Sequence, residues 1–264
     1  MSWRSLLFDS LPDEPHSVPA PARVFSAFLA GFVLSLVLFG SFYVLQYEWN
    51  WAATYRYKAK FIEGWLNTLG ISVASFVFSF LIGALSTIAY RSSFLPLRYL
   101  SSLYVEAIRG TPLLVQIYLF FYVVSDAAGI ENRYVVGVAI MALFSGAYIS
   151  EILRAGIEGI GRSQLLSAKA IGFSQYQTFR YVIAPQALRA SLPALAGQTA
   201  NLIKDSSLLS IIAISEFTLN AQEVNAITYS SFESFFPLAL GYLVLTLPIM
   251  RYSRVLERRL RFET

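Results

Sequence analysis

The feature that most constrains this chain is a series of long apolar runs. The clearest run, residues 24–46, contains no charged side chain. A helix needs about 20 apolar residues to cross the hydrocarbon core of a bilayer, so runs of this length predict transmembrane helices. They are too long for strands, and they lack the alternation of apolar and polar residues that strands show. We therefore expect an all-α, polytopic membrane protein.

About six runs reach or approach the length of a transmembrane helix. They cover residues 24–46, 64–90, 99–125, 134–155, 193–216 and 233–252. The third run is the least regular, because its first half contains Glu106, Arg109 and Pro112. The composition agrees with this assignment, since 56% of the residues are hydrophobic and only 14% are charged.

The distribution of Lys and Arg predicts how the chain lies in the membrane. If the six runs alternate across the bilayer, the loops on one side hold only Arg56, Lys58, Lys60 and Arg133 of the 20 basic residues. Arg109 and Lys204 lie within the runs, and all other basic residues fall on the opposite side with both termini. Since basic loops stay in the cytoplasm, we expect both termini there.

Several kinds of chemistry are excluded by residues that the chain lacks. There is no cysteine, and the single histidine, His16, lies in a Pro-rich segment. Thiolate metal sites, disulfides and histidine-based triads therefore cannot form. The glycine-rich segment 156–161 lacks the spacing of a nucleotide-binding loop, so we expect no catalytic residue and no cofactor in this chain. The basic excess is attributed to cytoplasmic loops rather than to a nucleic-acid partner.

One polar stretch, residues 167–186, interrupts the apolar pattern. Gly172 is suited to end a short helix at about residues 163–171, because glycine readily takes a left-handed conformation. Ser174 is suited to cap a second helix, and Gln177, three residues later, completes a capping box. Pro185 is expected to end this second helix. The stretch predicts two short helices at an angle on the cytoplasmic side.

Two roles for this stretch are open on physical grounds alone. It could be an interfacial hairpin that only connects two spans, or a docking surface for a soluble partner. The apolar side chains available for either role are Ala168, Ile171, Phe173, Tyr176 and Phe179.

The same stretch resembles the cytoplasmic loop of permease subunits of ATP-binding-cassette importers, in particular the polar amino-acid branch. That loop usually reads Glu-Ala-Ala, three residues, Gly, nine residues, an aliphatic residue, one residue and Leu-Pro. The matching positions here are Leu166, Ser167, Ala168, Gly172, Val182, Ala184 and Pro185. Leu166 therefore stands where the family has glutamate, and Ala184 where it has leucine.

Three further segments resemble the same branch and occur in the same order. They are VEAIRGTPLLVQIYLFFY at 105–122, GAYISEILRAGIEGI at 146–160 and NLIKDSSLLSIIAISEFT at 201–218. The resemblance covers about residues 64–262. The first 63 residues lie outside it and add one transmembrane helix to the five that are usual in the family.

The resemblance implies a type I importer permease of the bacterial inner membrane for polar or general amino acids. It implies two permease subunits, two cytoplasmic ATP-binding subunits that hold ATP and Mg, and an external substrate-binding protein. Residues 163–177 would act as a coupling helix that lies in a cleft of the ATPase and moves as a lever. The residues expected at this contact are Leu166, Ser167, Ala168, Lys169, Ala170, Ile171 and Gly172. The missing glutamate and the extra helix favour a paralogue as the second permease.

The chain divides into four parts on these expectations. A Pro-rich cytoplasmic tail covers residues 1–23, and an extra transmembrane helix with an external loop covers 24–63. The permease core covers 64–252, including a cytoplasmic coupling loop at about 156–190, and a basic cytoplasmic tail covers 253–264.

Charged and amide residues inside the spans are candidates for the substrate path or a gate. Lys204 and Asp205 are expected near the middle of a span, where a charge costs roughly 2.5–3.5 kcal/mol and needs a cavity or a partner. Candidate partners are Glu106, Arg109, Glu151 and Arg154. They would form either a structural ion-pair network or contacts with the substrate. Further candidates are Asn67, Gln116 and Glu216, which could bind an amino acid or serve helix packing.

Three other functions stay open. The cargo could be another small solute, since the loop reports on coupling to an ATPase rather than on cargo. The chain could be a stand-alone channel or secondary transporter, which would work without an ATPase. It could also be a membrane scaffold without transport, although charges within a span argue against this.

Overall fold

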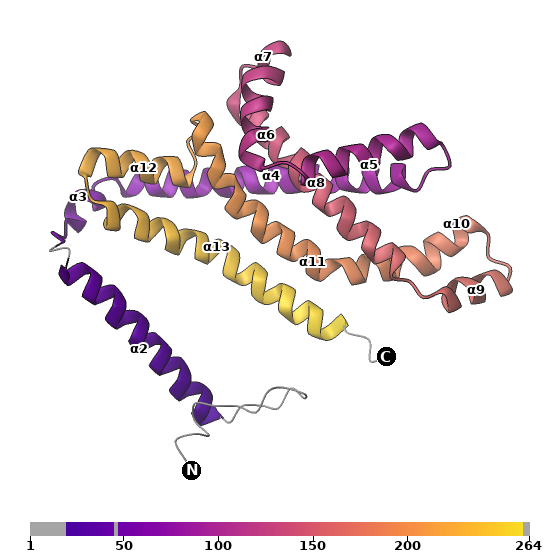
Figure 1. Ribbon diagram of the computed structural model, residues 1–264, viewed down its shortest axis with the longest axis horizontal. Coiled ribbons are helices and arrows are strands. Elements are labelled where there is room, and N and C mark those ends of the chain that lie inside the picture. Colours follow the sequence, from indigo (N-terminus) through magenta and orange to yellow (C-terminus); the bar gives the residue numbers. More distant parts are fainter. Residues whose placement is uncertain (1–19, 45–46, 261–264) are drawn as a thin grey trace. The chain divides into compact units, whose positions relative to one another are not determined.

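The computed structural model describes residues 20–44 and 47–260 (Figure 1). These residues form helices joined by short connections, and no strand occurs among them, in agreement with the expected all-α class. The expected N-terminal tail lies almost entirely outside the described residues. The chain separates into two compact units, with the boundary between Trp49 and Asn50.

The first unit contains helix α2, Ala20–Val44. Its segment Val24–Ser41 is long and apolar enough to cross a membrane, and none of that segment is buried. Phe28, Phe32 and Phe39 are all more than half exposed. A helix that is apolar on every side is typical of a membrane span, in agreement with the first predicted run.

The second unit is built around α4, Lys58–Tyr90, and α8, Arg133–Glu158. Both helices are long and apolar enough to span a membrane. They approach closely because a glycine lies at their contact: a Cβ atom at Gly83 would lie 2.7 Å from Cγ2 of Ile149. Small residues of this kind let membrane helices pack backbone to backbone.

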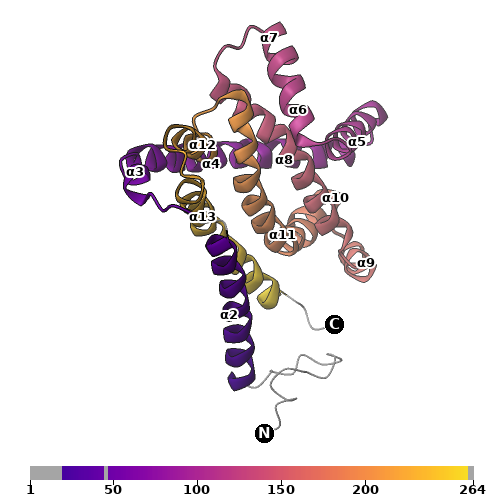
Figure 2. The same cartoon turned by 60° about the vertical axis from the view of Figure 1, so that its left-hand side comes forward.

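The third predicted run is broken rather than straight. It forms α5, Leu95–Arg109, and a second arm made of α6, Leu113–Leu119, the π-helical turn η1, Phe120–Val124, and α7, Ser125–Ala127. The two arms are bent by 109°, and Figure 2 shows α6 and α7 pointing away from α5. The break falls at Pro112, which has no N–H group to donate to the preceding turn.

The fifth predicted run also differs from expectation. Helix α11, Ala184–Asp205, ends within that run and continues as the 3₁₀ helix η3, Ser206–Ile212. Among the described residues, four helices are long and apolar enough to span a membrane, or five if the bent pair is one span, against the six expected. α11 is not one of them, because polar side chains such as Gln198 and Lys204 interrupt its apolar surface.

The second unit also contains α3, Trp51–Tyr55, α12, Phe217–Thr228, and α13, Ser231–Leu260. α13 packs against α11 and runs beyond residue 252, where the last span was expected to end. Oγ of Ser253 donates a hydrogen bond of 2.8 Å to the carbonyl of Pro193. The buried apolar core lies among α4, α6, α8, α11 and η3, and includes Ile117, Met141 and Leu209.

Candidate functional site

The polar stretch begins with α9, Arg162–Ala170, which ends at Gly172 as predicted. Gly172 has φ of +82°. Its N–H donates to the carbonyl of Lys169 at 3.1 Å, and the Phe173 N–H donates to the carbonyl of Ala168 at 3.0 Å. These two bonds form a Schellman motif, which fixes the direction in which the chain leaves α9.

Helix α10, Gln175–Thr178, begins with the predicted capping box. Oγ of Ser174 accepts a hydrogen bond from the Gln177 N–H at 3.2 Å, and the Gln177 side-chain oxygen accepts one from the Ser174 N–H at 2.8 Å. The turn between α9 and α10 is thus hydrogen-bonded on both sides. We call residues 162–178 the coupling hairpin, and its bonding makes it a defined unit rather than a loose connection.

The prediction that Pro185 ends the second helix is wrong. A π-helical turn, η2, Phe179–Ile183, follows α10 and leads directly into α11. The Ala184 N–H bonds to the carbonyl of Phe179, five residues earlier. Pro185 follows directly, so its missing N–H falls where the π-helical bonding of η2 changes to the α-helical bonding of α11. Continuous helical backbone therefore joins the coupling hairpin to α11.

Most residues of the expected ATPase contact lie on the surface. Leu166 and Ile171 are 66% and 70% exposed, whereas Ala168 is only 3% exposed. Also exposed are Ser167, Lys169, Ala170 and Gly172. Ala168 thus packs inward, and two large apolar side chains stand on the surface of the hairpin. Clustered exposed apolar side chains beside polar ones are typical of an interaction site.

Charged side chains of α5 and α8 form a cluster near the bend. Nη1 of Arg109 lies 2.8 Å from Oε2 of Glu151, and the same oxygen lies 2.8 Å from Nη2 of Arg154. Arg154 also pairs with Glu158 at 3.1 Å. The guanidinium of Arg109 stacks on Tyr148, with 5.5 Å between the carbon and the ring centre. The cluster has the form of an ion-pair network that ties α5 to α8.

The same cluster borders a cavity of about 150 Å³, which Glu106 also lines. Lys204 and Asp205 lie elsewhere, at the end of α11. Their side chains form no ion pair or hydrogen bond with the part of the chain that the structure describes. The expected pairing of these two residues with the cluster is therefore wrong, because both guanidinium groups of the cluster already have carboxylate partners on α8.

Gln116 holds the bend between α5 and α6. Its side chain is buried, and Nε2 donates to the carbonyl of Ile108 at 2.7 Å. Nε2 also donates to the carbonyl and to Oγ1 of Thr111, at 3.1 and 2.8 Å. Carbonyl groups that lack helical partners at the end of α5 are thus satisfied. Gln116 therefore positions the bend, because its side-chain NH₂ group bonds to Ile108 and Thr111.

Glu216 and Asn67 are used at the junction between η3 and α12. Glu216 is fully buried and caps α12, since its carboxylate accepts from the N–H groups of Thr218 and Leu219 at 2.8 and 2.7 Å. Nδ2 of Asn67 donates to the carbonyl of Ser215 at 2.8 Å. Both side chains contribute to helix packing here, which was one of the two expected roles.

Sequence reasoning missed two polar residues at this junction, Asn220, which is buried, and Tyr242, which is half-buried. The Tyr242 hydroxyl donates to Glu216 at 3.1 Å, and Nδ2 of Asn220 donates to the carbonyl of Lys60 at 2.8 Å. A carboxylate near the N-terminus of a helix is favoured by the helix dipole, so the position of Glu216 directly before α12 is a local signal for its role. The other two hydrogen bonds join residues that lie far apart in the chain, so no local sequence pattern predicts them.

Comparison with known proteins places this chain in a family. Residues 79–262 match the family described as binding-protein-dependent transport system inner membrane component. The glutamine transport system permease protein GlnP of Escherichia coli (strain K12) is 34% identical over 217 residues, which are 81% of this chain and 99% of that protein. The L-cystine transport system permease protein TcyB of Bacillus subtilis (strain 168) is 35% identical over 194 residues, 73% of this chain and 83% of that protein.

Solved structures agree with the sequence comparisons. The chain matches a crystal structure of an amino acid ABC transporter with histidines at a TM-score of 0.75 and 33% identity, covering 81% of this chain and 100% of that one. An inward-facing structure of the MetNI methionine ABC transporter matches in fold alone, at a TM-score of 0.65 and 17% identity over 76% of this chain and 96% of that one. The resemblance read from four short segments is thus confirmed, and the chain belongs to the inner membrane components of binding-protein-dependent transport systems, the permease subunits of ABC importers.

Proposed function

We propose that this permease imports an amino acid, and that the coupling hairpin, residues 162–178, transmits the closure of a partner ATPase to the membrane helices. The observation that carries the proposal is the hairpin itself. It is fixed by a Schellman motif and a capping box, it exposes Leu166 and Ile171, and continuous helix joins it to α11. A rigid, exposed element attached to a membrane helix suits a lever better than a passive connection.

The class of cargo is proposed from the relatives. GlnP is named for glutamine and TcyB for L-cystine, so the similar proteins share amino-acid transport but not one substrate. We therefore propose an amino acid as cargo without choosing among them. A permease for another small solute remains the second candidate, and a panel of radiolabelled solutes would distinguish the two.

The proposed assembly contains two permease subunits, two cytoplasmic ATP-binding subunits and an external substrate-binding protein. ATP and Mg bind the ATPase subunits, and both termini of this chain lie in the cytoplasm, on the side of the basic loops. Closure of the ATPase pair would move the coupling hairpin and shift the membrane helices between inward-facing and outward-facing states. The driving energy enters as the difference in affinity of the ATPase for these two states.

Reconstitution into liposomes tests this function. The complete assembly is expected to take up labelled amino acid only when ATP and the binding protein are supplied, and the purified permease alone should move none. Downhill movement by the permease alone would identify a channel or a secondary transporter instead. Failure of any ATPase subunit to co-purify with the chain would contradict the proposed partnership.

A further inference from the structure

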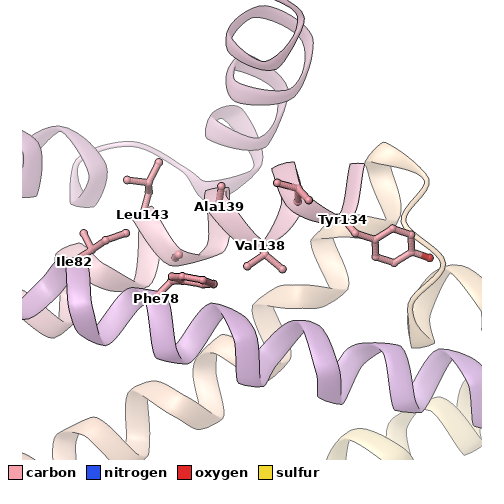
Figure 3. A pocket seen from close by; sticks show the side chains of 8 residues that line it. Phe78, Ile82, Tyr134, Val138, Ala139 and Leu143 are labelled. Atoms are coloured by element: carbon pink, nitrogen blue, oxygen red, sulfur yellow. The ribbon is translucent and has the colours of Figure 1, made fainter. Parts of the chain in front are cut away.

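An apolar groove runs along the surface of the second unit between α4 and α8. Its first part is a cavity of about 660 Å³, and Figure 3 shows Phe78 and Ile82 of α4 facing Val138 and Leu143 of α8 across it. Nearly every atom that lines it is apolar. Because both helices are long enough to span a membrane, this part of the groove lies at the depth of the lipid chains.

The groove continues toward the end of α4. A second cavity of about 500 Å³ lies between α4 and α5, and it shares Ile82 and Leu143 with the first. Ala89 and Leu100 lie on opposite walls of this second part, near the turn that joins α4 to α5. The two cavities thus form one elongated apolar surface, which we call the α4–α5–α8 groove.

Two arginines lie close in the chain to Ala89 and Leu97, which line the second part of the groove. Arg91 directly follows α4, and Arg98 lies in the first turn of α5. The guanidinium carbon of Arg98 lies 5.5 Å from the ring centre of Tyr90, so Arg98 reaches back to the end of α4. Neither arginine forms an ion pair within the described residues, and residues 91–105 contain no acidic side chain.

Other groups near Tyr90 reinforce this positive character. Arg154 lies on the same ring at 5.4 Å, although Glu151 and Glu158 pair with it. The N-terminus of α5 has no side-chain cap, so its first N–H groups add a partial positive charge beside Arg98. An apolar groove therefore ends at two unpaired cations on a membrane-spanning unit.

We propose that this groove binds one molecule of an anionic phospholipid, with an acyl chain along Ile82 and Leu143 and the phosphate beside Arg91 and Arg98. The charge arrangement favours a lipid over a protein helix, because a single lipid supplies a long apolar chain that ends in an anion. Basic pockets between membrane helices are known sites of anionic headgroups. Tyr90, on which Arg98 rests, also lines the cavity of the Arg109 and Glu151 cluster, so the headgroup end of the site borders that cluster.

Native mass spectrometry of the full chain in detergent tests the site. We expect retention of dioleoyl phosphatidylglycerol as a one-to-one adduct, and little retention of dioleoyl phosphatidylcholine at the same concentration. Arg91→Gln with Arg98→Gln should weaken phosphatidylglycerol binding by roughly 30-fold, the loss typical of two juxtamembrane basic residues. Arg251→Gln with Arg254→Gln, two exposed arginines on α13, is the matched control and should retain the lipid.

A second variant tests the groove separately from the charges. Ala89→Phe fills part of the second cavity, between α4 and α5, and leaves both arginines in place. This variant should therefore also lose the phosphatidylglycerol adduct. Soluble glycerol phosphate, which lacks acyl chains, should not compete.

Three results would overturn the proposal. Equal retention of the two lipids would show that the charge has no role. Equal loss in both arginine pairs would show only general attraction of anions. Unchanged lipid binding in the Arg91 and Arg98 variant, together with loss of ATPase binding, would assign these arginines to the protein partner.

Discussion

Gly172 occupies a backbone conformation that few other residues tolerate. It turns the chain between α9 and α10 at φ of +82°, where a residue with a Cβ atom is less stable by about 1–2 kcal/mol. We expect Gly172→Val to distort the turn and abolish stimulation of the ATPase by loaded binding protein. Insertion of the permease into the membrane should be unchanged. ATP hydrolysis by the reconstituted assembly measures the effect.

Gly161→Val is the matched control for that substitution. Gly161 has φ of −60° and ψ of 138°, and a Cβ atom there would meet only Oγ of Ser163 at 3.6 Å. The control should therefore hydrolyse ATP as the unmodified assembly does. Normal stimulation in Gly172→Val would remove the lever role of the coupling hairpin.

Leu166 decides what kind of contact the hairpin offers. The side chain is 66% exposed and apolar at a position where the family pattern has a glutamate. Burying a leucine stabilises a contact by about 1.5–3 kcal/mol. We expect Leu166→Ala to weaken binding of the ATPase subunit by about tenfold, which corresponds to about 1.4 kcal/mol. A binding titration with purified ATPase measures this change.

The control for Leu166 is Leu103→Ala. Leu103 is 64% exposed but lies on α5, outside the coupling hairpin. Its truncation should leave ATPase affinity unchanged. Equal affinities for all three proteins would show that Leu166 does not touch the partner.

At the scale of elements, the sequence predicted unbroken helices well and interrupted ones poorly. The runs at 64–90 and 134–155 correspond to α4, Lys58–Tyr90, and α8, Arg133–Glu158. Hydropathy reports these helices because an unbroken apolar run occupies most of the length of each. It does not report a π-helical turn or a 3₁₀ continuation, since both change hydrogen bonding without changing composition. The prediction that Pro185 ends the second helix was wrong for this reason, because η2 continues the helix into α11.

For the same physical reason, the sequence predicted the local geometry of the candidate site but not its contacts between distant helices. Gly172 and the capping box of Ser174 and Gln177 are local signals, and the structure confirms their geometry. The partners of Lys204 and Asp205 depend on how distant helices pack, which spacing alone does not encode. The ATPase-contact role of residues 166–172 stays a prediction.

The bend between α5 and α6 depends on one amide. Gln116 is buried and reaches three acceptors on Ile108 and Thr111. Loss of such a donor leaves buried carbonyls unsatisfied, at a cost of about 1–3 kcal/mol. We expect Gln116→Leu to lower the free energy of unfolding by this amount in detergent. Thermal or denaturant unfolding of the purified chain measures it.

Gln186→Leu provides the comparison for Gln116. Gln186 is half-buried and donates one hydrogen bond of 2.9 Å, to the carbonyl of Val182 in the adjoining turn η2. Its loss should change the free energy of unfolding much less. If both variants were equally stable, the amide of Gln116 would not hold the bend.

At the scale of the whole molecule, the chain consists of two units of unequal role. Residues 50–264 contain the whole segment that matches the family, and α2 belongs to the other unit. The match to GlnP covers 99% of that relative with 217 residues, fewer than the 264 of this chain. We therefore expect the permease function to reside in the second unit.

Removal of residues 1–47 tests this division. We expect the shortened chain to insert, to bind the ATPase and to support ATP-dependent uptake, because the segment that matches the family begins only at residue 79. Native mass spectrometry of the complex, together with uptake, measures the result against the full chain. A shortened chain that inserts but no longer assembles would assign α2 a role in holding the subunits together.

The helical connection between the coupling hairpin and α11 has a mechanical consequence. The backbone is helical from Gln175 through η2 to Asp205, a length of about 45 Å. Pro185 and Pro193 each remove one backbone hydrogen bond from this length, and prolines and π turns are positions where helices bend. We therefore expect a displacement of the hairpin to reach α11 partly as bending at these two prolines, and not as rotation of a straight helix.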